Sequence, residues 1–172
     1  MDHSLQDRQV KEMMKQPKAG MQVGIIHLRM VKEGRSLYGM GRFTRPETAA
    51  EMVRPLLAEA DREMIAVLSL SVKMDPLAIE IAAVGGTDNC QVDIKSIFKH
   101  ALLSNASRII CFHNHPSGDS SPSEEDRCIT KRIREAGELL GISLMDHIIV
   151  GDGTYYSFKE NGALGPYGKG EI

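Results

Sequence analysis

Two histidines one residue apart, His113 and His115, are the residues of this sequence best suited to chemistry. They follow an apolar, β-branched run at residues 108–112, which predicts a buried strand. Because side chains at i and i+2 of a strand point to the same face, the two imidazoles are expected side by side at the strand end. Neutral imidazole is a common zinc ligand. The pair therefore predicts part of a metal site.

A third ligand is available a short distance along the chain. Residues 116–122 are rich in Pro, Gly and Ser and predict a turn that folds the chain back. Asp126 then falls in the first turn of the next helix, from which its carboxylate can reach the imidazoles. A catalytic zinc typically has three protein ligands and an open fourth position. His113, His115 and Asp126 are the predicted ligands of one Zn²⁺ ion.

The same stretch also has a simpler interpretation. Ser123 and Asp126 form an S-x-x-D pattern typical of a helix start, with Ser123 as the N-cap and acidic residues facing the helix dipole. A single His-x-His pair is likewise weak support for a metal site. The two interpretations are compatible, since Ser123 and Asp126 can cap the helix and serve the metal together.

Length and composition indicate one globular domain. The chain has 172 residues, of which 42% are hydrophobic and 26% are charged, close to the globular average. Its net charge of −2 gives no general attraction to nucleic acid, although a local patch for DNA stays open. No apolar run has membrane-spanning length, and the polar N-terminus lacks the apolar core of a signal peptide. Three widely spaced cysteines fit reduced thiols, so we expect a cytoplasmic protein.

Hydrophobic periodicity predicts alternating helices and strands. A helix opens at Pro46 and is expected to break near residues 53–54 because of Pro55, with a short second helix reaching residue 60. The elements expected after it are strands 64–70 and 77–84, helix 93–103, strand 108–112, helix 123–140, and strands 144–150 and 154–158. This order predicts the α/β class, with a mixed sheet flanked by helices.

The two long helices show apolar stripes that predict their buried faces. The stripe of the first helix consists of Ile94, Ile97, Phe98, Ala101 and Leu102, which leaves His100 off that face. The stripe of the second consists of Ile129, Ile133, Ala136 and Leu140, and Gly141 is expected to end the helix. Residues 1–43 are expected to form an N-terminal arm with an edge strand at 21–31, and residues 163–172 a flexible tail.

The spacing of the candidate site residues resembles a known pattern. His113, His115, seven residues, Ser123, two residues and Asp126 match the JAMM motif of the MPN+ metalloproteases without a gap. From about residue 44 to residue 162 the chain is similar to the RadC-like branch of that family. The supporting marks are FHNHPSG at 112–118, ELLG at 138–141, DHIIVG at 146–151 and YSF at 156–158.

The resemblance implies a single MPN/JAMM-like domain over residues 44–162, with zinc as its one cofactor. It also implies hydrolysis of a peptide or isopeptide bond, with Glu63 as the general base at a strand start and Ser123 as the oxyanion donor. Glu80 is the rival base, but it lies inside a predicted strand. The rival function is a RadC-like binding module of DNA repair or recombination that hydrolyses nothing.

Two departures from the family pattern concern these expectations. No helix-hairpin-helix segment is evident in residues 1–43, which weakens the association with DNA repair. Many relatives have Pro-Arg-Glu where residues 93–95 of this chain are Asp-Ile-Lys. Whatever the Pro-Arg-Glu motif does in those relatives, its chemistry is altered here.

The sequence leaves two roles open for each of three further residues, and it leaves the oligomeric state open. Asn114 and Ser117 either contact substrate or form the turn, and His147 either supports a ligand imidazole or is a core residue. A protein or peptide substrate is expected, no membrane is expected, and a homodimer stays open.

Overall fold

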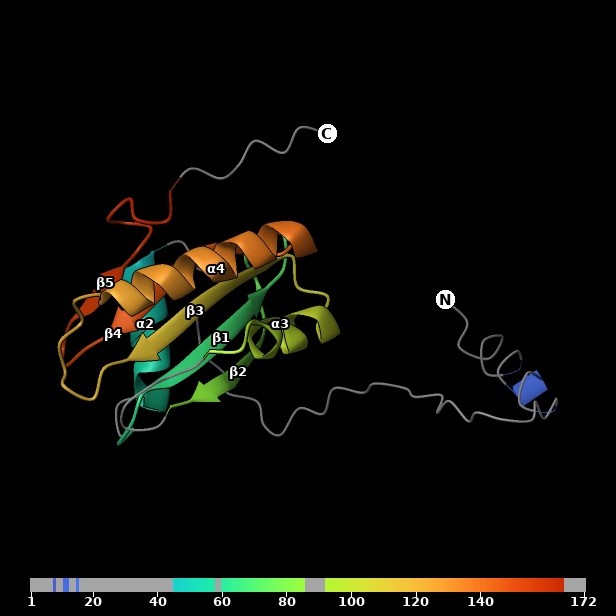
Figure 1. Cartoon of the computed structure of the whole chain (residues 1–172), viewed down its shortest axis with the longest axis horizontal. Helices are drawn as coiled ribbons and strands as arrows, with labels where there is room; N and C mark the ends of the chain where they lie inside the picture. The colour runs from blue at the N-terminus through green and yellow to red at the C-terminus, as the bar shows by residue number, and fades with distance from the viewer. Residues whose placement is uncertain are drawn as a thin grey trace.

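Five strands form one mixed sheet in the order β2-β1-β3-β4-β5, as the computed structural model shows (Figure 1). The strands are β1 (Met64–Leu70), β2 (Pro76–Val84), β3 (Arg108–Asn114), β4 (Ser143–Val150) and β5 (Tyr155–Ser157). β1 is antiparallel to β2 and β3, β4 is parallel to β3, and β5 is antiparallel to β4. The expected α/β class is therefore confirmed, as is the expected order of elements apart from the separate helix after Pro55.

The structure describes residues 45–57, 60–85 and 92–165, together with residues 8, 11, 12 and 15. The predicted arm and edge strand at 1–43 lie almost wholly outside the described residues. Of the predicted tail, residues 163–165 are described. Leu164 is buried there against the core, and its carbonyl accepts a hydrogen bond from Arg134. The packed part of the chain thus extends beyond residue 162.

Helices cover both faces of the sheet, as Figure 1 shows. α2 (Pro46–Leu57) packs on one face, and α3 (Ile94–Leu103) and α4 (Glu124–Leu140) pack on the other. Alternate residues of β3 serve the two cores: Ile109 and Cys111 face α3 and α4, while Phe112 faces α2. None of the helices in these described ranges is long and apolar enough to cross a membrane.

The predicted break at Pro55 is wrong, because α2 continues through it to Leu57. Pro55 cannot donate a hydrogen bond to the carbonyl of Glu51, but only two residues follow it, so a single bond is lost in the last turn. Burial of Met52, Val53 and Leu57 against the sheet holds that turn in place. Tertiary packing thus overrides the local signal.

The buried faces of α3 and α4 differ from the predicted stripes. His100 is buried and its Nδ1 lies 3.1 Å from Ser69 Oγ, whereas Leu102 is exposed. On α4, Thr130 is buried and Leu140 is exposed. A prediction based on the spacing of apolar residues does not consider polar ones. It therefore misses buried polar residues, such as His100 and Thr130, that find a hydrogen-bonding partner in the core.

Candidate metal centre

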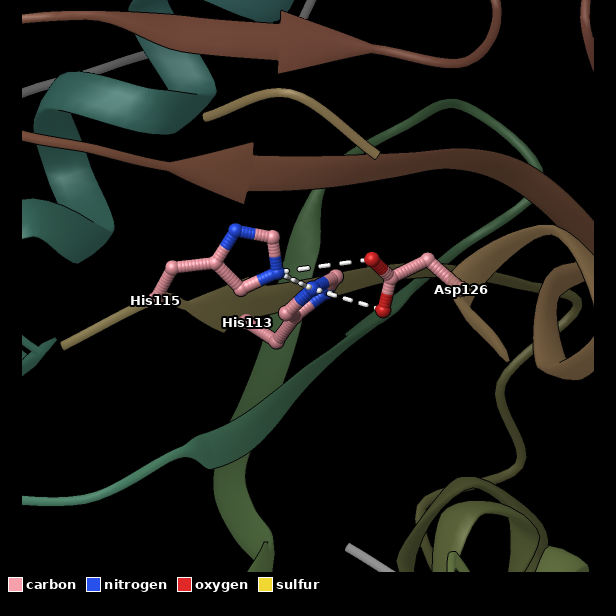
Figure 2. Close-up of side chains that lie close together, drawn as sticks. All are labelled: His113, His115 and Asp126. Atoms are coloured by element: carbon pink, nitrogen blue, oxygen red, sulfur yellow. Dashed lines mark hydrogen bonds and ion pairs between the residues drawn. The ribbon is translucent and has the colours of Figure 1, made fainter. Parts of the chain in front are cut away.

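His113, His115 and Asp126 converge at the carboxyl end of β3, where α4 begins (Figure 2). β3 extends two residues further than predicted, so His113 lies inside the strand and His115 just after it. The two Nε2 atoms are 3.0 Å apart. Asp126 Oδ1 lies 3.1 Å from His113 Nε2, and Asp126 Oδ2 lies 3.4 Å from His115 Nε2. The three predicted ligands are thus together and could hold a metal ion.

His115 is oriented by the turn that follows it. Its Nδ1 donates a hydrogen bond to the backbone carbonyl of Asp119 at 2.7 Å. A carbonyl only accepts, so Nδ1 carries the hydrogen and Nε2 is left to face Asp126. The hydrogen bond with Asp126 raises the pKa of the His115 imidazole, and the nearby Glu63 carboxylate adds to this effect.

His113 is oriented from within the sheet. Its Nδ1 lies 2.9 Å from Nε2 of His147, which is fully buried on the neighbouring strand β4. His147 Nδ1 in turn lies 2.6 Å from the hydroxyl of Thr130. Burial lowers the pKa of His147 well below the usual value, so this imidazole is neutral at ordinary pH. His147 therefore contacts the imidazole of a predicted ligand directly.

Asp146 has a different task from its neighbour His147. Adjacent residues of a strand point to opposite faces, so Asp146 cannot reach the ligand imidazoles. Its carboxylate instead accepts hydrogen bonds from Ser157 Oγ at 2.6 Å and from the backbone N–H groups of His147 and Lys159. Burial raises the pKa of Asp146, and these hydrogen bonds oppose that effect. Asp146 ties β4 to the end of β5 and to the chain just after it.

Ser123 and Asp126 form the capping box that the sequence predicted. Asp126 N–H donates to Ser123 Oγ, while Asp126 Oδ2 accepts from the Ser123 backbone N–H and hydroxyl, both at 2.7 Å. Burial alone would raise the pKa of Asp126, but hydrogen bonds with His113, His115 and Ser123 hold it well below its usual value. The carboxylate is ionised and its Oδ1 faces His113.

An open cavity of about 1140 Å³ surrounds the three residues. Glu63, Ser123 and Ser117 line it as well. Glu63 lies directly before β1, as predicted, whereas Glu80 lies within β2 and is not among the lining residues. The fold therefore brings Glu63, some fifty residues upstream in sequence, into the same cavity as the histidines.

Asn114 connects the Glu63 segment to β3. Its Oδ1 accepts the backbone N–H of Met64 at 2.9 Å, and its Nδ2 donates to the carbonyl of Arg62 at 3.1 Å. The side chain is 5% exposed and points away from the cavity face. Asn114 is thus neither a turn former nor a cavity residue. It holds both backbone neighbours of Glu63.

The turn at 116–122 rests on the turn between β4 and β5. Asp152 N–H donates to the Gly118 carbonyl at 2.8 Å, and Ser120 Oγ lies 3.1 Å from Thr154 Oγ1. A Cβ on Gly151 would lie 2.4 Å from the Gly118 carbonyl oxygen, so this approach requires glycine. Ser117 Oγ accepts the Asp119 N–H within the turn, at 3.4 Å.

Two contributors to the site escaped the sequence reasoning, Thr130 and the Asp119 carbonyl. A signal existed for Thr130, because it lies four residues after Asp126 and so on the same helix face. A backbone acceptor such as that of Asp119 has no residue-type signal at all.

Known proteins resemble this chain over most of its length. The family described as RadC-like JAB domain matches residues 43–163. A UPF0758 protein of Shouchella clausii is 39% identical over 158 residues, which are 89% of this chain and 69% of that protein. A UPF0758 protein of Thermotoga maritima is 44% identical over 104 residues, which are 60% of this chain and 47% of that protein. A UPF0758 protein of Listeria monocytogenes is 44% identical over 117 residues, which are 68% of this chain and 52% of that protein.

The names of these relatives state no activity. This chain spans about half the length of the Thermotoga and Listeria proteins. The family match covers the described domain, including the histidine pair, Glu63 and the capping box. On this similarity, the chain belongs to the RadC-like JAB domain family.

Proposed function

We propose that the protein is a JAMM-type zinc hydrolase that cleaves a peptide or isopeptide bond. The observation that carries the proposal is the convergence of His113, His115 and Asp126 in a cavity that Glu63 also lines. Membership in the RadC-like JAB family is compatible with this activity.

The donor set and its spacing support zinc. Nitrogen and oxygen ligands of a tetrahedral zinc lie about 2.0–2.2 Å from the ion, which separates them by roughly 3.3–3.5 Å. The separation of His115 Nε2 from Asp126 Oδ2, 3.4 Å, falls within that range, and the other two, 3.0 Å between the Nε2 atoms and 3.1 Å from His113 Nε2 to Asp126 Oδ1, lie slightly below it. Two imidazoles and one carboxylate also suit zinc chemically, and three protein ligands leave a fourth position for chemistry.

The chain's own residues divide the reaction between them. When bound, zinc supplies a water acidified towards a pKa of about 7 and Lewis-acid polarisation of the substrate carbonyl. Glu63 accepts the proton of the attacking water and returns it to the leaving amine. Its place in an open cavity next to His115 gives both water and substrate access.

Ser123 has to change partners to act as an oxyanion donor. Its hydroxyl donates to Asp126 Oδ2 at 2.7 Å. The Asp126 carboxylate would accept that hydrogen bond more weakly while it held a cation. The hydroxyl can then rotate towards the developing oxyanion, a contribution of about 3 kcal/mol in comparable enzymes.

The charge of the cavity favours a peptide over the DNA-binding alternative. Among the described lining residues, six are acidic, namely Asp61, Glu63, Asp93, Asp119, Glu125 and Asp126, and two are basic, namely Arg62 and Arg132. Phosphate contacts dominate nucleic-acid binding and require a basic surface. A protein or peptide substrate is therefore the partner we propose for this cavity.

The reducing interior of the cell is the location we propose for this activity. Cys111 is buried and Cys128 exposed, and both are free thiols. Free thiols fit a cytoplasmic protein better than a secreted one.

Zinc content and bond cleavage test the proposal directly. Purified protein is expected to hold about one zinc per chain by elemental analysis and to cleave members of a peptide and isopeptide library. Glu63→Gln should retain the zinc and lower the cleavage rate by about 10²–10⁴-fold, because it removes the base and not a ligand.

Glu80→Gln is the matched control, since it makes the same substitution in β2 at the rival base. It should cleave at the wild-type rate. Absence of zinc uptake by the wild-type protein contradicts the enzyme proposal. Unchanged cleavage by Glu63→Gln would mean that another residue is the general base. Binding of DNA without any cleavage favours the binding-module alternative.

A further inference from the structure

His113 is connected through the side chains of His147 and Thr130 to the backbone of the helix that carries Asp126. His113 Nδ1 contacts His147 Nε2 at 2.9 Å, and His147 Nδ1 contacts Thr130 Oγ1 at 2.6 Å. Thr130 Oγ1 lies 2.5 Å from the backbone carbonyl oxygen of Asp126. All three side chains of this relay are nearly or fully buried: His113 is 4% exposed, Thr130 3% and His147 0%.

The chemistry of the last acceptor determines the direction of every hydrogen bond in the relay. The Asp126 carbonyl can only accept, so the single hydroxyl hydrogen of Thr130 points to it. Thr130 Oγ1 must then accept from His147, which places a hydrogen on His147 Nδ1.

The second nitrogen of His147 has only one remaining role. The ring is fully buried and stacks on Phe158 with centroids 5.2 Å apart, and burial of this kind keeps an imidazole neutral. In a neutral imidazole with hydrogen on Nδ1, Nε2 accepts. His113 must therefore donate from Nδ1, which leaves Nε2 as the ring atom directed at Asp126 and His115.

We propose that Thr130, acting through His147, is the positioning residue that selects the tautomer of His113 in which Nε2 can bind zinc. This inference rests on the zinc site of the proposed function and adds the residues that prepare it. A hydrogen on His113 Nε2 would have to move before any metal could bind there.

The relay also links the two ligands that come from different elements. The carbonyl that receives the Thr130 hydroxyl belongs to Asp126 itself, and α4 presents both residues on one face. The Thr130 hydroxyl therefore fixes the position of α4, which carries Asp126, relative to β3, which carries His113. His115 needs no such relay, because a backbone carbonyl already receives its Nδ1 hydrogen.

The tautomers can be read in the metal-free wild-type protein. Nitrogen-15 NMR of histidine-labelled protein at about pH 8 distinguishes the ring nitrogen that carries hydrogen from the one that does not. Hydrogen on Nδ1 of both His113 and His147 supports the relay. Hydrogen on Nε2 of His147, or its absence from Nδ1 of His113, overturns it.

Zinc affinity of Thr130 variants tests the consequence. Thr130→Val keeps the β-branched shape but removes the hydroxyl, so His147 can turn its hydrogen to Nε2 and place one on His113 Nε2. Loss of such an outer partner typically weakens metal binding 10–100-fold. Competition with a chelator should show this loss, and NMR should show the changed tautomer of His113.

Thr130→Ser is the matched control, because it keeps the hydroxyl and loses only a methyl group. It should bind zinc as the wild type does, which a purely packing role of the buried methyl would not predict. Wild-type affinity in Thr130→Val overturns the relay, as does equal weakening in both variants. If the wild type takes up no zinc, the proposed function fails, while the NMR tautomers still decide for or against the relay.

Discussion

The two halves of the cavity are held in different ways. In the ligand half, formed by β3, the turn at 116–122 and α4, the two histidine side chains are held by their own hydrogen bonds: His113 with His147, and His115 to the Asp119 carbonyl. In the base half, formed by residues 62–64 at the start of β1, the fixed part is the backbone on both sides of Glu63, which Asn114 holds.

This difference suits the two tasks that we propose for the halves. A metal ligand must keep one geometry, so its side chain is fixed. A general base has to move a proton between water and the leaving group, so its side chain needs freedom around a fixed backbone position. The comparison predicts that substitutions in the ligand half change zinc binding, whereas substitutions in the base half change turnover with zinc retained.

Removing a ligand should have the largest effect. Zinc sites with four protein ligands bind with roughly 10–16 kcal/mol, so one ligand contributes about 3 kcal/mol and its loss weakens binding on the order of 100-fold or more. His115→Ala should therefore lose zinc during purification, as measured by elemental analysis, and lose all cleavage with it. His100→Ala is the control, since that buried histidine lies outside the cavity lining. Full zinc retention by His115→Ala would show that the ligand half is wrongly assigned.

Releasing the base segment comes next. Asn114→Ala removes both hydrogen bonds to the residues flanking Glu63, and a displacement of about 1 Å at a catalytic group can cost roughly 100-fold in rate. We expect kcat to fall by about that factor while the zinc content stays at the wild-type level. Asn114 lies between the two histidine ligands in sequence, so loss of zinc in this variant would contradict the division into two halves. Ser117→Ala, a cavity residue in the turn, should leave both quantities unchanged.

The residues of the ligand half could be predicted from the sequence, whereas the hydrogen bonds by which Asn114 holds the base half could not. His113, His115, Ser123 and Asp126 lie within one strand–turn–helix unit, so local spacing alone brings their side chains together. Glu63 came only from the family resemblance.

The contacts of Asn114 could not be foreseen, because the antiparallel register of β1 and β3 decides which backbone groups a strand residue meets. The errors in predicting the buried faces of α3 and α4, and in predicting a break in α2, have the same origin. Each depends on which buried partner a residue finds, and local periodicity does not contain that information.

A smaller effect is expected where the turn of the ligand half rests on the β4–β5 turn. Gly151→Ala places a methyl group against the Gly118 carbonyl and pushes away the segment that carries the Asp119 acceptor of His115. We expect a loss of about 1–3 kcal/mol of stability from overpacking, measured by thermal unfolding. Zinc affinity should fall by about 10-fold, the lower end for a lost outer partner.

Gly153 offers the matched control in the same turn. It has φ of +63°, but a Cβ there would meet nothing within 4 Å. Gly153→Ala should cost only the backbone strain, about 1 kcal/mol, and leave zinc affinity unchanged. Equal zinc weakening in both variants would mean that the turn as a whole matters, and not its contact with Gly118.

The smallest effect should appear in the pH dependence of thermal stability. The pKa of His115 is raised in the folded, metal-free protein, so its contribution is complete below the unfolded value of about 6.5 and is lost as pH rises through the folded value. The pKa of Asp126 is lowered, so its contribution stays constant at neutral pH. His100 and His147, whose pKa values are lowered, change stability only below about pH 6.5.

Above about pH 6.5 the Tm of the metal-free protein should therefore fall as pH rises. Zinc displaces the His115 proton, so its stabilisation should grow over the same range. The difference in Tm between the zinc-loaded and metal-free protein should widen as pH rises. His115→Ala should remove the decline in the metal-free protein, whereas Asn114→Ala should keep it, because the titrating imidazole belongs to the ligand half. A decline that survives His115→Ala would assign the titration to another group and remove this distinction between the halves.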